Sequence, residues 1–194
     1  MTLAAFATLN ARLRPMDRGE RYEDPLMDAL DGRAFYEVVG GGSQLLPGGN
    51  EIEYCCIDID IHHLERAVPL ITDTLTEAGA PKGSFLAYTD QNEKRHSIRF
   101  GKTVGLAIYL NGTELPDEVY SKCDVNYVIS VIDELLEGFG SYQSYWQGPT
   151  ETALYIYGSS HGKMRKALRG LLADYPLCSK SRLVDLPTKI AKGG

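Results

Sequence analysis

One segment of eleven residues constrains the fold of this chain more than any other. In residues 51–61, EIEYCCIDIDI, apolar and polar side chains alternate along most of the segment. One parity carries Cys55, Ile57, Ile59 and Ile61, and the other carries Tyr54, Cys56, Asp58 and Asp60. A period of two is the pattern of a β-strand with one face buried and the other in water. The segment therefore predicts a sheet with one covered face and one open face.

The segments around this strand predict helices that cover it. Over residues 63–78, apolar side chains recur at helical spacing, and a strand is predicted at 84–89. A short helix is predicted from Asp24-Pro25, and longer helices at 124–137 and 161–174. Further strands are predicted at 35–46, 141–147, 152–158 and 181–186, with a strand or bent hairpin at 96–110. Alternation assigns the core face of the sheet to Ile57, Ile59, Ile61, Val104, Leu106, Ile108, Leu154 and Ile156.

Two stretches of the chain share one order of elements. Residues 51–88 and 148–185 both give strand, helix, strand, and at an offset of 97 residues Ile57 falls on Leu154 and Ile59 on Ile156. A true duplication and a shared topology would both produce this match. The order of elements predicts an α+β protein of the ferredoxin-like α/β-plait type, alone or in an internally duplicated or extended form. We expect a mostly antiparallel sheet with the helices on one face.

The predicted elements suggest where the domain begins and ends. Residues 1–34 mix charges of both signs with Pro15, Gly19 and Pro25, which predicts an irregular N-terminal segment that ends in the short helix. Residues 35–186 hold the other predicted elements and are expected to form the plait domain. Residues 187–194, PTKIAKGG, are predicted to be a flexible tail.

Charge and composition narrow the class of protein. Lys and Arg number 20 against 26 Asp and Glu, a net charge of −6, which argues against a dedicated nucleic-acid or anionic-membrane binder. The chain has no run of apolar residues long enough to span a membrane and no signal peptide pattern. The four cysteines show no CxxC spacing, which favours reduced packing residues. We therefore expect a cytoplasmic protein without a cofactor.

The opposite parity of the strands predicts a sheet face rich in tyrosine and aspartate. Tyrosine combines a large apolar ring with a polar tip, which suits recognition surfaces. Aromatic and polar side chains also occur on half-exposed sheets without any binding role, so both interpretations stay open. The candidate partner-binding residues on this face are Tyr54, Asp58, Asp60, Tyr109, Tyr155 and Tyr157.

Asp58, Asp60 and His62 form the strongest candidate for a metal or acid–base site. Their spacing of two residues places all three side chains on one face if the strand continues to His62. Two carboxylates and an imidazole can hold a divalent cation. The alternative is a solvated strand end beside a helix N-terminus, whose dipole favours carboxylates. No nucleophile motif occurs, and GSSHGK at 158–163 departs from the P-loop pattern, which favours a binding protein over an enzyme.

A small acidic α/β chain without a catalytic motif resembles bacterial immunity proteins. The segments ARLRPMDRGERYEDPL and TEAGAPKGS are also similar to segments of bacterial proteins. The resemblance is one of type, and it assigns no role to any residue. It implies a binding module that inhibits a basic protein toxin by covering the toxin's active site. The alternative is a plait domain that binds a small molecule or a metal, or an enzyme that uses Asp58, Asp60 and His62.

Overall fold

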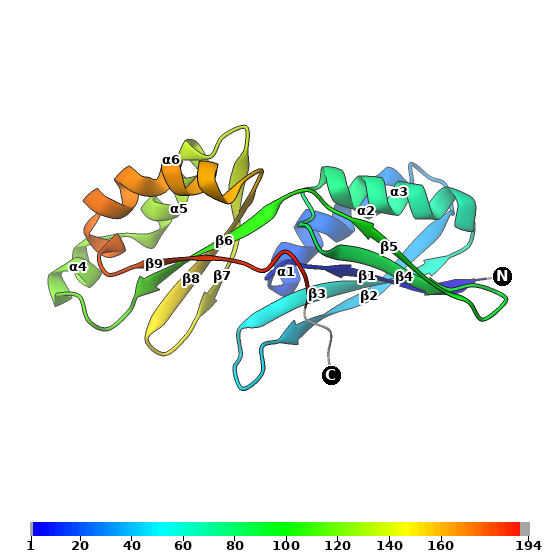
Figure 1. Cartoon of the computed structure of the whole chain (residues 1–194), viewed down its shortest axis with the longest axis horizontal. Helices are drawn as coiled ribbons and strands as arrows, with labels where there is room; N and C mark the ends of the chain where they lie inside the picture. Colours follow the sequence, from blue (N-terminus) through cyan, green and yellow to red (C-terminus); the bar gives the residue numbers. More distant parts are fainter. Residues whose placement is uncertain (1, 191–194) are drawn as a thin grey trace. The chain divides into compact units, whose positions relative to one another are not determined.

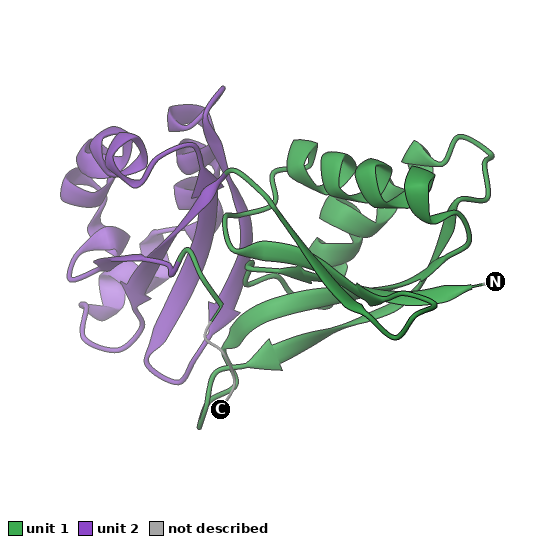
Figure 2. Ribbon diagram, turned by 45° about the vertical axis from the view of Figure 1, so that its right-hand side comes forward, with its two compact units in different colours: residues 1–102, 188–194 green, residues 103–187 purple. Residues whose placement is uncertain are grey.

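The strand predicted from the alternating segment is β3 (Ile52–Ile61), and it lies between β2 (Tyr36–Leu45) and β1 (Leu3–Leu9) in an antiparallel sheet. The computed structural model describes residues 2–190. It divides the chain into two compact units, coloured separately in Figure 2. Of the described residues, unit 1 comprises 2–102 and 188–190, and unit 2 is Thr103–Pro187.

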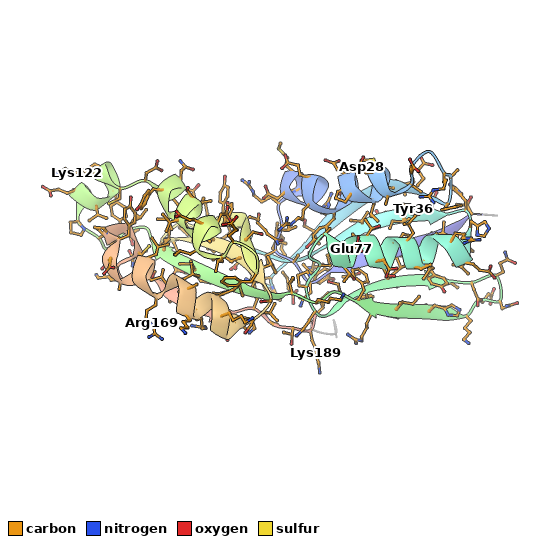
Figure 3. All side chains as sticks on the ribbon, turned by 90° about the horizontal axis from the view of Figure 1, so that it is seen from above. Asp28, Tyr36, Glu77, Lys122, Arg169 and Lys189 are labelled. Carbon is orange, nitrogen blue, oxygen red and sulfur yellow. The ribbon has the colours of Figure 1, made fainter. Side chains whose placement is uncertain are left out.

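Unit 1 has a five-stranded sheet with the order β2-β3-β1-β4-β5. Its remaining strands are β4 (Ser84–Thr89) and β5 (Arg95–Phe100). Its helices are α1 (Pro15–Arg18), the π-helix η1 (Gly19–Glu23), α2 (Asp24–Ala29) and α3 (Leu64–Glu77). Figure 1 shows α2 and α3 over the same face of this sheet, and Figure 3, with Tyr36 and Glu77 labelled, looks down onto that helical layer.

Unit 2 has a four-stranded sheet with the order β7-β8-β6-β9. The strands are β6 (Val104–Asn111), β7 (Gly140–Gln147), β8 (Glu151–Gly158) and β9 (Arg182–Asp185). The helices are α4 (Asp117–Lys122), α5 (Val125–Leu135), α6 (His161–Asp174) and the 3-10 turn η2 (Pro176–Cys178). In Figure 1, α5 and α6 lie on one side of the sheet.

The two units share one topology, and the fold is the predicted ferredoxin-like α+β class. Each unit contains the order strand, helix, strand, strand, helix, strand, and unit 1 adds β5 at its edge. All neighbouring strands pair antiparallel. The stretches 51–88 and 148–185 correspond to β3-α3-β4 and β8-α6-β9.

The core lies between each sheet and its helices. In unit 1, Ile57 and Ile59 are buried with Ile71 and Leu75 of α3, and Tyr36 donates a 2.6 Å hydrogen bond to the Leu26 carbonyl of α2. In unit 2 the predicted core residues of β6 and β8 pack with the apolar stripes of α5 and α6. Every residue that alternation assigned to the core is buried: Ile57, Ile59, Ile61, Val104, Leu106, Ile108, Leu154 and Ile156.

The predicted irregular segment at residues 1–34 contains a strand, so this prediction is wrong for residues 3–9. Residues 3–9, predicted to belong to an irregular segment within 1–34, form β1, which pairs with both β3 and β4. The sequence LAAFATL hides this strand because alanine has a low β propensity. Ala5 and Ala7 are nevertheless completely buried, because small side chains allow the helices to approach the sheet closely.

The predicted plait domain at 35–186 is divided between the two units, with the boundary after Lys102. The segment predicted as one strand or hairpin at 96–110 forms β5 and β6, which belong to different sheets. Gly101 ends β5 with φ +90°, where a Cβ would collide with the Pro81 carbonyl oxygen. Of the predicted tail 187–194, residues 191–194 lie outside the described part of the chain.

Candidate functional site

The predicted binding residues lie on two separate sheets. Tyr54, Asp58 and Asp60 are in β3 of unit 1, on the face without helices. Tyr109 is in β6 of unit 2, and Tyr155 and Tyr157 are in β8 of the same unit. The prediction of one shared tyrosine and aspartate face is therefore wrong, because the repeat places the two groups of strands in different sheets.

The three tyrosines of unit 2 that were predicted to bind a partner are buried. Tyr155 and Tyr157 are 1% and 2% exposed, and Tyr109 is 7% exposed. Gly105 leaves room for the ring of Tyr157, and the Arg182 guanidinium lies 3.9 Å from the centroid of the Tyr109 ring. The sequence carries the signal for this burial, because β6 and β8 contain near-continuous apolar runs, the pattern of strands covered on both faces.

In unit 1 the helix-free face of the sheet carries a large apolar side chain at its centre. Phe6 of β1 is 50% exposed and pairs with Asp58 of β3 on one side and Ala87 of β4 on the other. Thr8, two residues along, pairs with Cys56 and Phe85. We call this surface the open face of unit 1 and define it by Phe6, Tyr54, Cys56, Asp58, Asp60, Phe85 and Ala87; Thr8 has the same parity but is buried.

Sequence reasoning missed Phe6 because its segment was predicted to be irregular. In a strand, Phe6 has the parity opposite to Ala5 and Ala7, which are completely buried on the helix side. An alternation of alanine with one aromatic side chain over residues 3–9 was the available signal. Its half-exposed ring between strands is the type of side chain that anchors protein interfaces.

Glycines of the edge strand β2 expose the carboxylate of Asp58. Gly40 pairs with Asp58 and Gly42 pairs with Cys56, so neither glycine places a side chain beside these residues. A Cβ on Gly40 would lie 3.5 Å from Asp58 Oδ2. The carboxylate of Asp58 therefore lies beside bare backbone, where an approaching cation meets no neighbouring side chain from β2.

On the helix-free side of the sheet of unit 1, negative charges lie on β2 and β3, and the positive charge of Arg99 lies on β5 at the other edge. Glu37 of β2 pairs directly with Asp60 of β3, although like charges opposite each other destabilise an antiparallel pair. Among residues 2–190, the carboxylates of Glu37, Asp58 and Asp60 have no hydrogen-bond or ion-pair partner. At the other edge of the sheet, Arg99 of β5 pairs with Phe85. The acidic side chains of this surface thus lie on β2 and β3, next to Phe6 of β1.

The structure does not assemble the predicted metal site. β3 ends at Ile61, and the backbone nitrogens of His62 and His63 both donate to the Phe35 carbonyl, so the chain leaves the strand before His62. His62 Nδ1 lies 3.3 Å from Thr2 Oγ1. Within residues 2–190, no group of three or more His, Cys, Asp or Glu side chains is placed to hold a metal ion. Asp58 and Asp60 therefore lie near the end of a strand, and His62 follows it, without forming a metal site.

One imidazole and carboxylate pair exists elsewhere in unit 1. His96 Nε2 lies 2.8 Å from Asp90 Oδ2, and the His96 ring stacks on Tyr88 at 4.8 Å between centroids. The hydrogen bond from His96 holds the pKa of Asp90 below its ordinary value. Asp90 also accepts from the backbone nitrogens of Asn92 and Lys94, so the pair fastens the hairpin between β4 and β5.

The glycine-containing segment at 158–163 also has a structural role. Ser160 is the N-cap residue of α6, and His161 Nε2 lies 2.9 Å from the Gly105 carbonyl oxygen of β6. Arg165 of the same helix forms an ion pair with Asp185 of β9 at 2.8 Å. These contacts fasten the first turns of α6 to the sheet, as expected for a helix start rather than a phosphate loop.

Comparison with known proteins gives no functional assignment. No protein family and no curated protein matches the sequence. A solved protein of unknown function from Galdieria sulphuraria covers 96% of this chain and 98% of its own, at 9% identity and a TM-score of 0.30. A complex of TiaS with a transfer RNA, AMPCPP and agmatine matches 87% of this chain and 56% of its own, at 12% identity and a TM-score of 0.34.

A mutant chlorite dismutase from Candidatus Nitrospira defluvii covers 96% of this chain and 92% of its own, at 9% identity and a TM-score of 0.28. Similarities this low support no inference from those proteins to this one. In the described residues, every helix is too short or too polar to cross a membrane. The open face of unit 1 is therefore the surface from which a function is inferred.

Proposed function

We propose that this protein is a binding module whose open face of unit 1 docks on a basic surface of a protein partner. The observation that carries the proposal is the half-exposed ring of Phe6 directly beside Asp58, whose carboxylate has no partner among residues 2–190. An apolar anchor flanked by unpaired carboxylates matches a partner that offers an apolar pocket within a cationic surface.

The anchor and the carboxylates would make different contributions. Burying the Phe6 ring in a partner would supply binding energy and slow dissociation. The carboxylates of Asp58 and Asp60 would raise the association rate at low salt. A cation placed between Glu37 and Asp60 would also relieve the repulsion of that like-charged pair. The local destabilisation in the free protein is thus a reason to expect a cationic partner.

An inhibitor that neutralises a basic toxin in the cytoplasm, as immunity proteins do, is the specific form of this proposal. The anchors differ from those predicted from the sequence. Tyr54 is kept from the sequence prediction, and Phe6 takes the place of Tyr109, Tyr155 and Tyr157, which are buried in unit 2. A binding protein of this type needs no catalytic group, and its specificity depends on the shape and charge of one surface.

The experiment compares capture by matched variants. Wild-type protein, Phe6→Ala and the double variant Asp58→Lys with Asp60→Lys are immobilised and exposed to lysate of the native cell at low salt. Met27 of α2 is 51% exposed, so Met27→Ala controls for loss of an equally exposed apolar side chain. Asp28→Lys with Glu77→Lys, both labelled in Figure 3, controls for the same change of charge on the helix layer.

The proposal expects a basic protein that wild type and both controls retain and both open-face variants lose. Kinetic measurements with that protein should show a loss of at least about 2 kcal/mol of binding free energy for Phe6→Ala, mostly through faster dissociation. Asp58→Lys with Asp60→Lys should mainly slow association. Equal capture by the open-face variants and the controls would overturn the proposal, and so would the absence of any face-dependent partner.

A further inference from the structure

A cavity of about 670 Å³ lies in unit 2, between α5 and the sheet. Its aliphatic walls include Leu110 of β6, Ile129 of α5, Leu154 of β8 and Leu177 of η2, and further walls come from α4 and β7. Cavities that bind small molecules commonly have volumes of about 300–1,000 Å³ and predominantly apolar walls. The cavity involves residues of unit 2 alone and none of the open face of unit 1, so it is independent of the function proposed above.

A β-bulge turns two tyrosines toward this cavity. Tyr142 and Tyr145 of β7 are three positions apart, a spacing that places side chains on opposite faces of a regular strand. The register shift between Tyr142 and Ser144 adds one residue, so Tyr142 pairs with Ile156 and Tyr145 pairs with Leu154. Both tyrosines therefore share the helix side of the sheet, and both line the cavity. Bulges that re-aim side chains in this way are frequent next to binding sites.

Tyr120 of α4 forms another aromatic wall, and its position is fixed. Its hydroxyl accepts a 3.0 Å hydrogen bond from the Leu115 backbone nitrogen and donates a 3.3 Å hydrogen bond to the Asn111 carbonyl. The N-terminus of α5 is fixed as well, because Asp124 Oδ1 accepts from the Asn126 backbone nitrogen at 2.8 Å. Walls held by hydrogen bonds lower the entropic cost of ordering the site around a ligand.

The chemistry of the lining determines the class of ligand. Each described residue that lines the cavity is uncharged. An ion placed there would lose its hydration without gaining a counter-ion. Aromatic rings and aliphatic side chains favour an apolar or aromatic body, and Asn126, Gln147 and Thr152 offer amide and hydroxyl groups for a polar substituent. We infer that this cavity binds an uncharged, mainly aromatic small molecule with a hydroxyl or carbonyl group.

The test uses two probes of similar size, one neutral and one negatively charged. The whole chain is titrated at neutral pH with 2-naphthol, which is neutral, and with 2-naphthoate, which is an anion. Nuclear magnetic resonance of the amide groups follows both titrations. We expect saturable binding of 2-naphthol that shifts amides of α5 and β7, and at least about tenfold weaker binding of 2-naphthoate. Unsaturable binding of 2-naphthol, equal binding of the two probes, or shifts confined to other elements would overturn the inference.

A pair of variants on α5 tests the position of the site. Ile129→Trp fills the cavity, whereas Ser130→Trp places the same ring on the exposed side of the same helix. We expect at least about tenfold weaker binding of 2-naphthol by the first variant and unchanged binding by the second. Equal affinities in two folded variants would overturn the inference. If Ile129→Trp does not fold, the amide shifts of the wild type decide the result alone.

Discussion

Arg18 Nε donates a 2.6 Å hydrogen bond to Glu23 Oε1, which joins the two ends of the π-helix η1 across one turn. The same guanidinium donates from Nη1 to the Gly42 carbonyl of β2 at 3.1 Å. Arg18 is 8% exposed, and its guanidinium lies against Gly41, where a Cβ would meet it at 3.0 Å. One buried side chain therefore fastens the first helical segment of unit 1 to its edge strand.

Arg18→Ala is expected to destabilise the protein by about 2–4 kcal/mol, because it removes the hydrogen bond and ion pair to Glu23 and a hydrogen bond to the Gly42 carbonyl. Arg14→Ala is the matched control. Arg14 pairs with Asp17 within the same segment, but its side chain is 40% exposed, and an exposed pair contributes about 0–1 kcal/mol. Urea unfolding measures both variants, and equal losses would contradict the role assigned to Arg18.

Two glycines predict opposite effects of the same substitution. Gly101 has φ +90°, and a Cβ there would lie 2.7 Å from the Ala80 carbonyl oxygen, so Gly101→Ala should destabilise the protein by at least about 1 kcal/mol. Gly170 lies inside α6 with nothing within 4 Å of an added Cβ. Gly170→Ala should therefore stabilise the protein by about 0.5–1 kcal/mol. Thermal unfolding of the two variants measures the signs, and a shared sign would contradict this account.

Most of the fold could be predicted from periodicity. The strand at 84–89 and the helix at 161–174 have the predicted bounds, and the core parity of β3, β6 and β8 is confirmed. These segments are long and strongly patterned, so local sequence and tertiary packing agree. The strand β1 was missed because its alanines pack closely at the sheet centre but give only a weak alternation of apolar and polar side chains.

The candidate site was less predictable. Alternation tells which residues of one strand share a face, but it does not tell which strands share a sheet. It therefore grouped Tyr54 with Tyr155, which lie in different sheets. Alternation also fails at a bulge, so the common orientation of Tyr142 and Tyr145 could not be predicted. Asp58 and Asp60 were placed on the open face correctly because β3 is regular from Cys55 to Ile61.

The pair of His96 and Asp90 predicts a loss of stability in acid. The hydrogen bond from His96 lowers the pKa of Asp90 from its ordinary value of 3.8, so the folded state favours the carboxylate. The unfolded chain then takes up the proton at a higher pH than the folded chain. The stabilisation is complete above pH 3.8 and disappears as the pH falls through the lower folded pKa.

Asp90→Asn should therefore reduce the difference in stability between pH 6 and the acid range, while wild type retains it. Urea unfolding midpoints measured over that range supply the comparison. Asp17→Asn, a change in another ion-paired aspartate of unit 1, serves as a control for general loss of negative charge. A pH dependence of Asp90→Asn that equals that of wild type would show that the hairpin pair makes no contribution.

The adjacent cysteines of β3 predict a sharp contrast in thiol reactivity. Cys55 faces the core and is completely buried, whereas Cys56 is half-buried on the open face opposite Thr8. Burial raises the pKa of Cys55 to about 12, so almost no thiolate forms at neutral pH. Iodoacetamide should modify Cys56 in the native protein and reach Cys55 only when unit 1 unfolds.

Tandem mass spectrometry of the peptide that contains both residues measures the two rates, with protein in urea as the control in which both thiols react. Similar native rates would mean that β3 does not present Asp58 and Asp60, which share the parity of Cys56, on an open face. The same modification also tests the proposed function. A carbamidomethyl group on Cys56 would lie beside Gly42 and should weaken the binding of a partner that docks on this surface.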